Sequence, residues 1–130
     1  MAPHWTRQYV GLPYIVGACD CASLTERVQR EQFGRTLCLP SAQGNNHRDW
    51  SKQIAEHKDR FVQPATDPQE GDIVLMAGRS YLNHIGTLVI IEHERYVLHA
   101  MFAAHQVCLH RLTRLDDVGL IIEGIYTWPA

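Results

Sequence analysis

The sequence predicts an α+β domain, because a helical period in its first half changes to strand-like alternation in its second half. The chain has 130 residues, of which 45% are hydrophobic and 20% are charged. This balance is typical of a folded domain and excludes disordered, collagenous and coiled-coil chains. The length accommodates one hydrophobic core, so we expect residues 1–130 to form a single domain.

One helix in the first half has clear start and stop signals. It is predicted to begin at Cys21, directly after Asp20, whose side chain can cap the first turn. Leu24 and Val28 lie at helical spacing on one side, and charged residues occupy the other. Gly34 stands where helices commonly end in a left-handed conformation. The thiol of Cys21 therefore falls at the helix N-terminus.

Three further segments surround this helix. The aromatic, Gly- and Pro-containing stretch Tyr9–Gly17 is predicted to be extended with turns. A second helix is predicted to begin at Asn46 and to end before Phe61. Pro64–Glu70 contains two prolines, which disfavour helix and interior strand, so we expect a surface connection.

The second half contains five segments that are rich in Val, Ile and Tyr and are separated by short polar turns. They are Ile73–Met76, His84–Ile91, Arg95–Ala100, Gln106–Leu112 and Leu120–Trp128. Short turns join strands that run in opposite directions. The sequence therefore predicts an antiparallel meander of about five strands, with the N-terminal helices packed on it.

Composition also excludes several classes of function. Lys and Arg number 12 against 14 Asp and Glu, without a basic cluster, so no nucleic acid partner is expected. The longest apolar runs, such as Ile73–Ala77, are far shorter than the roughly 18 residues that cross a bilayer, so no membrane partner is expected. Met1–Arg7 does not resemble a secretory signal, and we expect synthesis in the cytoplasm without one.

Cys21 is the first candidate for chemistry. A thiol at the first turn of a helix faces the positive end of the helix dipole and free N–H groups, which favour the thiolate. The alternative is a small, buried apolar residue, which is the commoner state of a free cysteine. A thiolate nucleophile also needs a proton acceptor, and His84 and His99 lie on two strands that we expect to be neighbours.

The other cysteines and histidines have plainer interpretations. Cys19, Cys38 and Cys108 are interpreted as packing residues, with a resolving-thiol role left open for Cys19. His99, His105 and His110 form the alternative of a metal site, but their spacing does not place them on one face. We therefore expect no metal and no cofactor.

Five short motifs carry a family resemblance. They are Gly11-Leu12-Pro13-Tyr14, Asp20-Cys21, Gly71-Asp72-Ile73-Val74, His84-Ile85-Gly86 and Leu98-His99-Ala100. In this order and spacing they resemble the NlpC/P60 family of papain-like cysteine peptidases, and most of all the branch found in phage tails. The resemblance covers about Trp5 to Leu112 and implies a papain-like NlpC/P60 fold.

The resemblance also implies roles for individual residues. Cys21 matches the nucleophile, His84 the general base and later acid, and His99 the residue that orients the base. Tyr14 matches a tyrosine that lines the substrate site, with amphipathic packing as its alternative, and Asp20, directly before the nucleophile, is also expected to bind substrate. One departure is Ser23, where family members often have Gly, which puts the local approach of the substrate in doubt.

The implied function is hydrolysis of peptide bonds in bacterial peptidoglycan, with the stem peptide as substrate. The implied context is the tail of a virion, with tail hub or tail-tip proteins as partners and the periplasm or cell wall as the place of action. Two alternatives remain open. One is a structural tail protein that keeps the fold with little or no turnover, and the other is a secreted antibacterial amidase effector.

Overall fold

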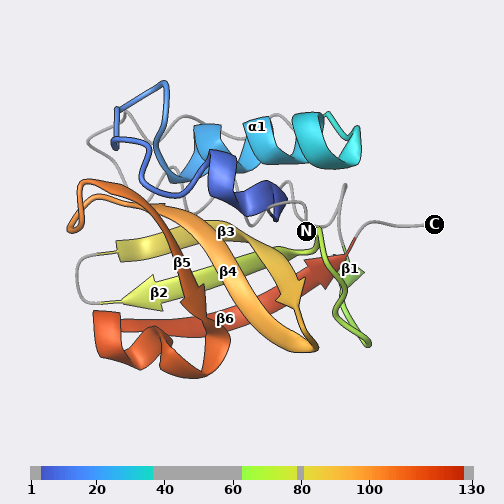
Figure 1. Cartoon of the computed structure of the whole chain (residues 1–130). Helices are drawn as coiled ribbons and strands as arrows, with labels where there is room; N and C mark the ends of the chain where they lie inside the picture. The colour runs from blue at the N-terminus through green and yellow to red at the C-terminus, as the bar shows by residue number, and fades with distance from the viewer. Residues whose placement is uncertain (1–3, 37–62, 79–80, 128–130) are drawn as a thin grey trace.

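The computed structural model describes residues 4–36, 63–78 and 81–127. An antiparallel sheet of six described strands has helix α1 on one face and the 3-10 helix η2 on the other (Figure 1). The elements in chain order are η1 (Trp5–Gln8), α1 (Cys21–Phe33), β1 (Gln63–Pro64), β2 (Ile73–Gly78), β3 (Tyr81–Ile91), β4 (Glu94–Met101), β5 (Gln106–Arg111), η2 (Leu112–Val118) and β6 (Leu120–Thr127). The predicted α+β class is confirmed.

The order of strands in the sheet is β1-β6-β2-β3-β4-β5. Strands β2 to β5 form the predicted meander, but β6 does not continue it beyond β5. Instead the chain passes through η2, and β6 pairs with the other side of β2. The expectation of one continuous meander was wrong at this strand, because pairing with β6 occupies the backbone groups that β2 would otherwise expose as an edge.

Two predictions fall partly or wholly outside the described residues. The second helix predicted from Asn46 lies outside them, as does Cys38. Of the connection predicted over Pro64–Glu70, Pro64 belongs to the two-residue strand β1, which pairs with β6 at the end of the sheet. A proline is compatible with that position because an edge strand leaves one row of N–H groups unpaired.

Helix α1 has the boundaries that its local signals predict. Asp20 caps it with extended backbone, and Gly34 ends it with φ of 65° in the left-handed region. The apolar side chains of Leu24 and Val28 are buried against the sheet. Burying such a side chain fully contributes about 1.5–3 kcal/mol, so packing and capping together fix the helix.

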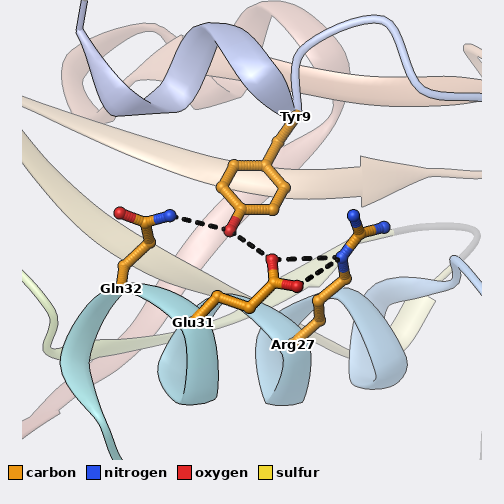
Figure 2. A network of polar contacts seen from close by, with 4 residues as sticks. All are labelled: Tyr9, Arg27, Glu31 and Gln32. Atoms are coloured by element: carbon orange, nitrogen blue, oxygen red, sulfur yellow. Dashed lines mark hydrogen bonds and ion pairs between the residues drawn. The ribbon is translucent and has the colours of Figure 1, made fainter.

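A network of polar contacts joins the N-terminal segment to α1 (Figure 2). The hydroxyl of Tyr9 donates to Glu31 at 2.7 Å and accepts from the side-chain amide of Gln32 at 3.0 Å. Arg27 in turn donates to Glu31 from one turn earlier in the helix. Because the Tyr9 side chain is also fully buried, this contact combines apolar packing with satisfied hydrogen bonds.

A second polar contact holds the C-terminal half of α1 to the start of the sheet. The buried amide of Gln29 donates to the carbonyl oxygen of Gly71 at 2.9 Å, directly before β2. Arg35 donates to the same carbonyl at 3.0 Å and to the Gln29 side-chain oxygen at 3.2 Å. The helix is therefore fixed to the sheet at a point far from its N-terminus, which limits how Cys21 can move.

The core consists of two clusters on opposite faces of the sheet. The α1-side cluster contains Tyr9, Cys19, Leu24, Val28, Val89, Leu98, Ala100 and Val107. The η2-side cluster contains Val74, Met76, Leu88, Val97, Met101, Leu115 and Leu120. Side chains alternate between the two faces along a strand, so the members of the two clusters show which face the other residues of β3 and β4 occupy.

Strands β3 and β4 form a hairpin. Glu92 and His93 form its turn, both with positive φ (52° and 70°), and Ile91 pairs with Glu94 across it. Consecutive positive φ values are typical of the turns whose twist matches a two-stranded hairpin. The paired register then runs from this turn to Thr87 and Leu98.

Gly86 lies just beyond that last pair, where β3 and β4 approach closely. A Cβ atom on Gly86 would lie 2.6 Å from Cγ2 of Val97 and 2.8 Å from the carbonyl oxygen of Leu98. Both distances are below normal contact, and the second involves backbone that cannot rotate away. The glycine is therefore required by space.

We expect Gly86→Ala to lower the free energy of unfolding by about 1–3 kcal/mol, as overpacking typically does. Urea denaturation followed by circular dichroism measures this change. Gly124→Ala in β6 is the matched control, because the nearest atoms to its Cβ belong to the side chain of Tyr126, at 3.0 Å. Equal shifts of the midpoint in both variants would contradict the close-approach explanation.

Candidate active site

The candidate nucleophile lies at the first residue of α1. The carboxylate of Asp20 accepts hydrogen bonds from the backbone N–H of Ser23 at 2.8 Å and of Gly17 at 2.7 Å. It is 1% exposed. These bonds tie the loop before α1 to the helix and hold Cys21 at the N-terminus, so Asp20 acts on the site by shaping the backbone around it.

Ser23, the departure from the family pattern, completes this cap. Its hydroxyl accepts from the backbone N–H of Asp20 at 2.8 Å and lies 2.8 Å from the Asp20 carboxylate, to which it donates. The two residues thus form a reciprocal capping box. Serine at this position has a clear structural reason, because a glycine would lose half of the box.

The sulfur of Cys21 lies against the backbone of β3. The backbone N–H of Ile85 donates to it, and the N–H groups of Ala22 and Cys21 itself act in the same way. The Ile85 N–H belongs to the peptide that joins His84 to Ile85. The thiol therefore contacts the peptide unit that directly follows the candidate base, although 63 positions separate Cys21 from His84 in the sequence.

The structure corrects the expectation that the helix N-terminus lowers the pKa of Cys21. Burial, with a smaller contribution from the charge of Asp20, raises the pKa of the Cys21 thiol to about 12, although the three N–H donors oppose the change. Cys21 is 7% exposed, so few water molecules can solvate a thiolate. The thiol is protonated at neutral pH.

The two candidate histidines contact each other directly. Nε2 of His84 on β3 lies 2.7 Å from Nδ1 of His99 on β4, within hydrogen-bond distance. His84 is 1% exposed and His99 is 0% exposed. Burial lowers the pKa of His84 to about 4, and burial together with the neighbouring rings of His84 and His110 lowers the pKa of His99. Both rings are neutral at pH 7.

The histidine pair lies just past the end of the β3–β4 ladder. Beyond Thr87 and Leu98, β3 pairs with β2 as far as His84 opposite Met76. Met76 belongs to the η2-side cluster, which places the His84 side chain on that face of the sheet. The thiol comes from the α1 side. Cys21 and His84 thus approach the same peptide from opposite faces of the sheet.

Sequence reasoning assigned His110 only to a possible metal site. Nδ1 of His110 on β5 lies 2.8 Å from Nε2 of His99, so both nitrogens of His99 have histidine partners. His105 lies exposed in the β4–β5 turn, with φ of 56°. Among the described residues, no group of three His, Cys, Asp or Glu side chains has an arrangement that could hold a metal ion.

The contact between His110 and His99 could have been predicted from the sequence only if the pairing register of β4 and β5 had been known. His99 is opposite Cys108 and Val97 is opposite His110, so the two rings are diagonal neighbours on one face. Such neighbours lie about 7–8 Å apart at the backbone, which long and aromatic side chains can span. The alternation of β4 and β5 alone does not reveal this pair.

Tyr14 lies near the β4–β5 turn. Its ring contacts that of Phe102 edge to face, with centroids 5.6 Å apart, and its backbone N–H donates to the carbonyl oxygen of His105 at 2.9 Å. It is half-buried and packs against the α1-side cluster. Exposed apolar side chains of Ile15 and Val16 follow it on the loop that leads to Cys21. The packing role considered for Tyr14 is therefore present.

The remaining described cysteines differ from Cys21 in their surroundings. Cys19 is buried in the α1-side cluster, as expected for a core residue. Cys108 is half-buried beside the η2-side cluster. Burial raises the pKa of both thiols. Both cysteines therefore have the packing role that the sequence predicts.

We expect the alkylation rate of Cys21 by iodoacetamide to rise about tenfold per pH unit between roughly pH 7 and pH 9, because only the thiolate reacts and its pKa lies above this range. Peptide mapping by mass spectrometry measures the rate, with Cys108 as an internal reference. A plateau in this range would instead indicate a preformed thiolate, and the burial argument would then be wrong.

Comparison with known proteins adds no family assignment. Neither a protein-family model nor a curated protein matches the sequence. Among the described residues, none of the helices has the length and apolar character that crossing a membrane requires. The features of this chain that bear on its function are therefore its motifs and the geometry of the site.

Proposed function

We propose that this chain is a cysteine peptidase or amidase that hydrolyses peptide bonds of bacterial peptidoglycan as a component of a phage tail. The observation that supports the chemistry is the Cys21 sulfur at a helix N-terminus, where it accepts a hydrogen bond from the Ile85 N–H. The paired rings of His84 and His99 lie beside this peptide. The substrate class and the tail context rest on the family resemblance of the motifs.

The protonation states favour general-base activation over a resting ion pair. The thiol of Cys21 is protonated and the ring of His84 is neutral at pH 7. His84 uses Nε2 to contact His99, so Nδ1 is the nitrogen that receives the thiol proton. This transfer requires the ring of His84 to come within hydrogen-bond distance of the Cys21 sulfur, which contacts the other face of the sheet. The proton moves as the sulfur attacks, as in other base-assisted nucleophiles.

The reaction then proceeds in two balanced steps. The Cys21 sulfur bonds to the amide carbon, the carbon–nitrogen bond breaks, and the leaving amine takes the proton from His84. Water then bonds to the thioester carbon while His84 accepts its proton, the carbon–sulfur bond breaks to release the carboxylic acid, and His84 returns the proton to the sulfur. No additional reactant besides water is needed.

Backbone N–H groups supply the electrostatic stabilisation. The N–H groups of Cys21, Ala22 and Ile85 act on the resting sulfur. They therefore lie near the carbon that the sulfur attacks, and we assign them as the donors to the substrate oxyanion. Fixed N–H donors in a site of low water content stabilise such an oxyanion strongly, and losing one typically costs about 10²–10³ in kcat. The Asp20 cap holds two of these donors in place at the helix N-terminus.

A structural tail protein with little turnover is the second candidate. The burial of Cys21, which is 7% exposed, and the raised pKa of its thiol favour this candidate. An antibacterial effector would perform the same hydrolysis through another delivery route. An immunity protein encoded beside the gene would distinguish the effector from a tail component.

Digestion of purified sacculi tests the proposal. The wild-type protein is expected to release soluble muropeptides whose masses show one cleaved peptide bond in the stem or cross-link. A heat-inactivated sample is the control for autolysis. Release by the wild type supports a hydrolase, whereas intact sacculi after prolonged incubation at equimolar protein would support the structural candidate.

A further inference from the structure

Three histidine rings form a continuous chain across three neighbouring strands. His84 on β3 contacts His99 on β4 at 2.7 Å, and His99 contacts His110 on β5 at 2.8 Å. Adjacent rings are tilted by 71° and 62°, with centroids 4.9 and 5.1 Å apart. His84 and His99 are fully buried, whereas His110 is half-buried. The chain therefore leads from the candidate base toward the protein surface.

The N–H protons of the three histidine rings depend on one another. A neutral imidazole has one N–H, so it donates from one nitrogen and accepts at the other. Each of the two ring-to-ring hydrogen bonds needs one donor and one acceptor. Because His99 uses both of its nitrogens, the three neutral rings have two consistent arrangements, in which all the bonds point toward His110 or all point toward His84.

The neutral state is the relevant one at pH 7. Burial lowers the pKa of His84, His99 and His110, and the closeness of the outer rings lowers that of His99 further. Protonation of two neighbouring rings would place two positive charges within hydrogen-bond distance of each other. The three histidine rings are therefore neutral before catalysis. The direction of the hydrogen bonds between them determines which nitrogen of His84 is protonated.

We propose that His110 is a positioning residue that accepts a hydrogen bond from Nε2 of His99 and thereby keeps Nδ1 of His84 free of a proton. With the bonds directed toward His110, Nε2–H of His84 donates to His99, and Nε2–H of His99 donates to His110. Nδ1 of His84 can then act as the base. This inference rests on the proposed function, since the hydrolase reaction requires that tautomer.

The opposite arrangement shows why this control matters. If His110 donated from Nδ1, then His99 would donate to His84, and Nδ1 of His84 would already have its proton. The base would be blocked without any change in charge or fold. A triad histidine held in the wrong tautomer can lose about 10⁴ in kcat, so the direction of the chain has a large effect on rate.

Ring-nitrogen NMR of ¹⁵N-histidine-labelled protein reads the tautomers directly. In the native protein we expect His84 and His99 each to have a protonated Nε2 and an unprotonated Nδ1. His110→Asn places an amide oxygen where Nδ1 of the ring accepts, so it should keep both tautomers. His110→Phe keeps an aromatic ring but removes the acceptor, so the His99 and His84 signals should shift toward a mixture of tautomers.

Turnover of sacculi gives a second readout. We expect His110→Phe to lower kcat roughly tenfold or more with KM unchanged, and His110→Asn to stay within about twofold of the native rate. His93→Asn, in the exposed β3–β4 turn, is the matched control and should change neither readout. Circular dichroism establishes that each variant is folded. The tautomers of the native protein are measured without any substitution.

The outcomes separate the two proposals. Native His84 or His99 with a protonated Nδ1, or unchanged ring signals in folded His110→Phe, would overturn the role of His110. The expected tautomers in a protein that leaves sacculi intact would overturn the hydrolase proposal alone. Loss of the tautomers in His110→Phe together with rescue by His110→Asn supports the inference.

Discussion

Cys21→Ala is expected to abolish the release of muropeptides, with a loss of at least about 10⁴ in kcat, because the covalent step has no substitute nucleophile. The sulfur lies at the helix N-terminus among the three backbone N–H donors described above. Alanine is compatible with the first turn of α1 and removes one atom from a buried position, so the fold should persist. Mass analysis of digested sacculi measures the loss, and circular dichroism establishes folding.

Cys108→Ala is the matched control. Cys108 has a thiol in a strand, half-buried and away from the N-terminus of α1, and its removal should leave kcat within about twofold. The assignment of Cys21 as nucleophile would be refuted by a folded Cys21→Ala variant that still releases muropeptides at the native rate. If Cys108→Ala lost activity while Cys21→Ala kept it, the nucleophile would be Cys108 and not Cys21.

His84→Ala is expected to reduce turnover to background, whereas His99→Ala should retain part of it. In the proposed mechanism His84 moves the proton, and His99 only orients it through the 2.7 Å contact between their rings. His99→Asn should recover part of the rate, because its amide oxygen can replace Nδ1 as the acceptor from His84. Initial rates of muropeptide release across the three variants measure the order.

His105→Asn provides the control for loss of an imidazole in general. His105 is exposed and has a positive φ of 56°, a conformation that asparagine tolerates, so both fold and rate should be unaffected. Native turnover in His84→Ala would rule out the proposed Cys-His mechanism. Equal and complete losses in His84→Ala and His99→Ala would show that orientation is as important as proton transfer.

Local signals were enough to predict the elements that position the site. Asp20 and Gly34 act within a few residues of the backbone that they cap, so the bounds of α1 followed directly from the sequence. The strands β2 to β5 were predicted within a few residues for the same reason. The pairing of β6 with β2 was missed, because it joins segments that are distant in sequence and no local pattern specifies it.

The candidate site was predicted less completely than the fold. The position of Cys21 at the start of α1 is a local property, but its raised pKa comes from burial against β3, which only tertiary structure determines. His84 and His99 were expected to be neighbours, and they are. The contact between His99 and His110 was missed because it depends on the β4–β5 register, which a shift of one residue would reverse.

The two-residue turn at Glu92 and His93 has a consequence at the far end of its hairpin. The turn sets the pairing of Ile91 with Glu94, and every later pair down to Thr87 and Leu98 follows from it. One residue more or less in that turn would slip β4 by one position and rotate His99 to the opposite face of the sheet. The position of His99 beside the proposed base is thus determined by the length of a solvent-facing turn that lies at the other end of the hairpin. The length of this turn therefore decides whether the ring of His99 faces that of His84 at all.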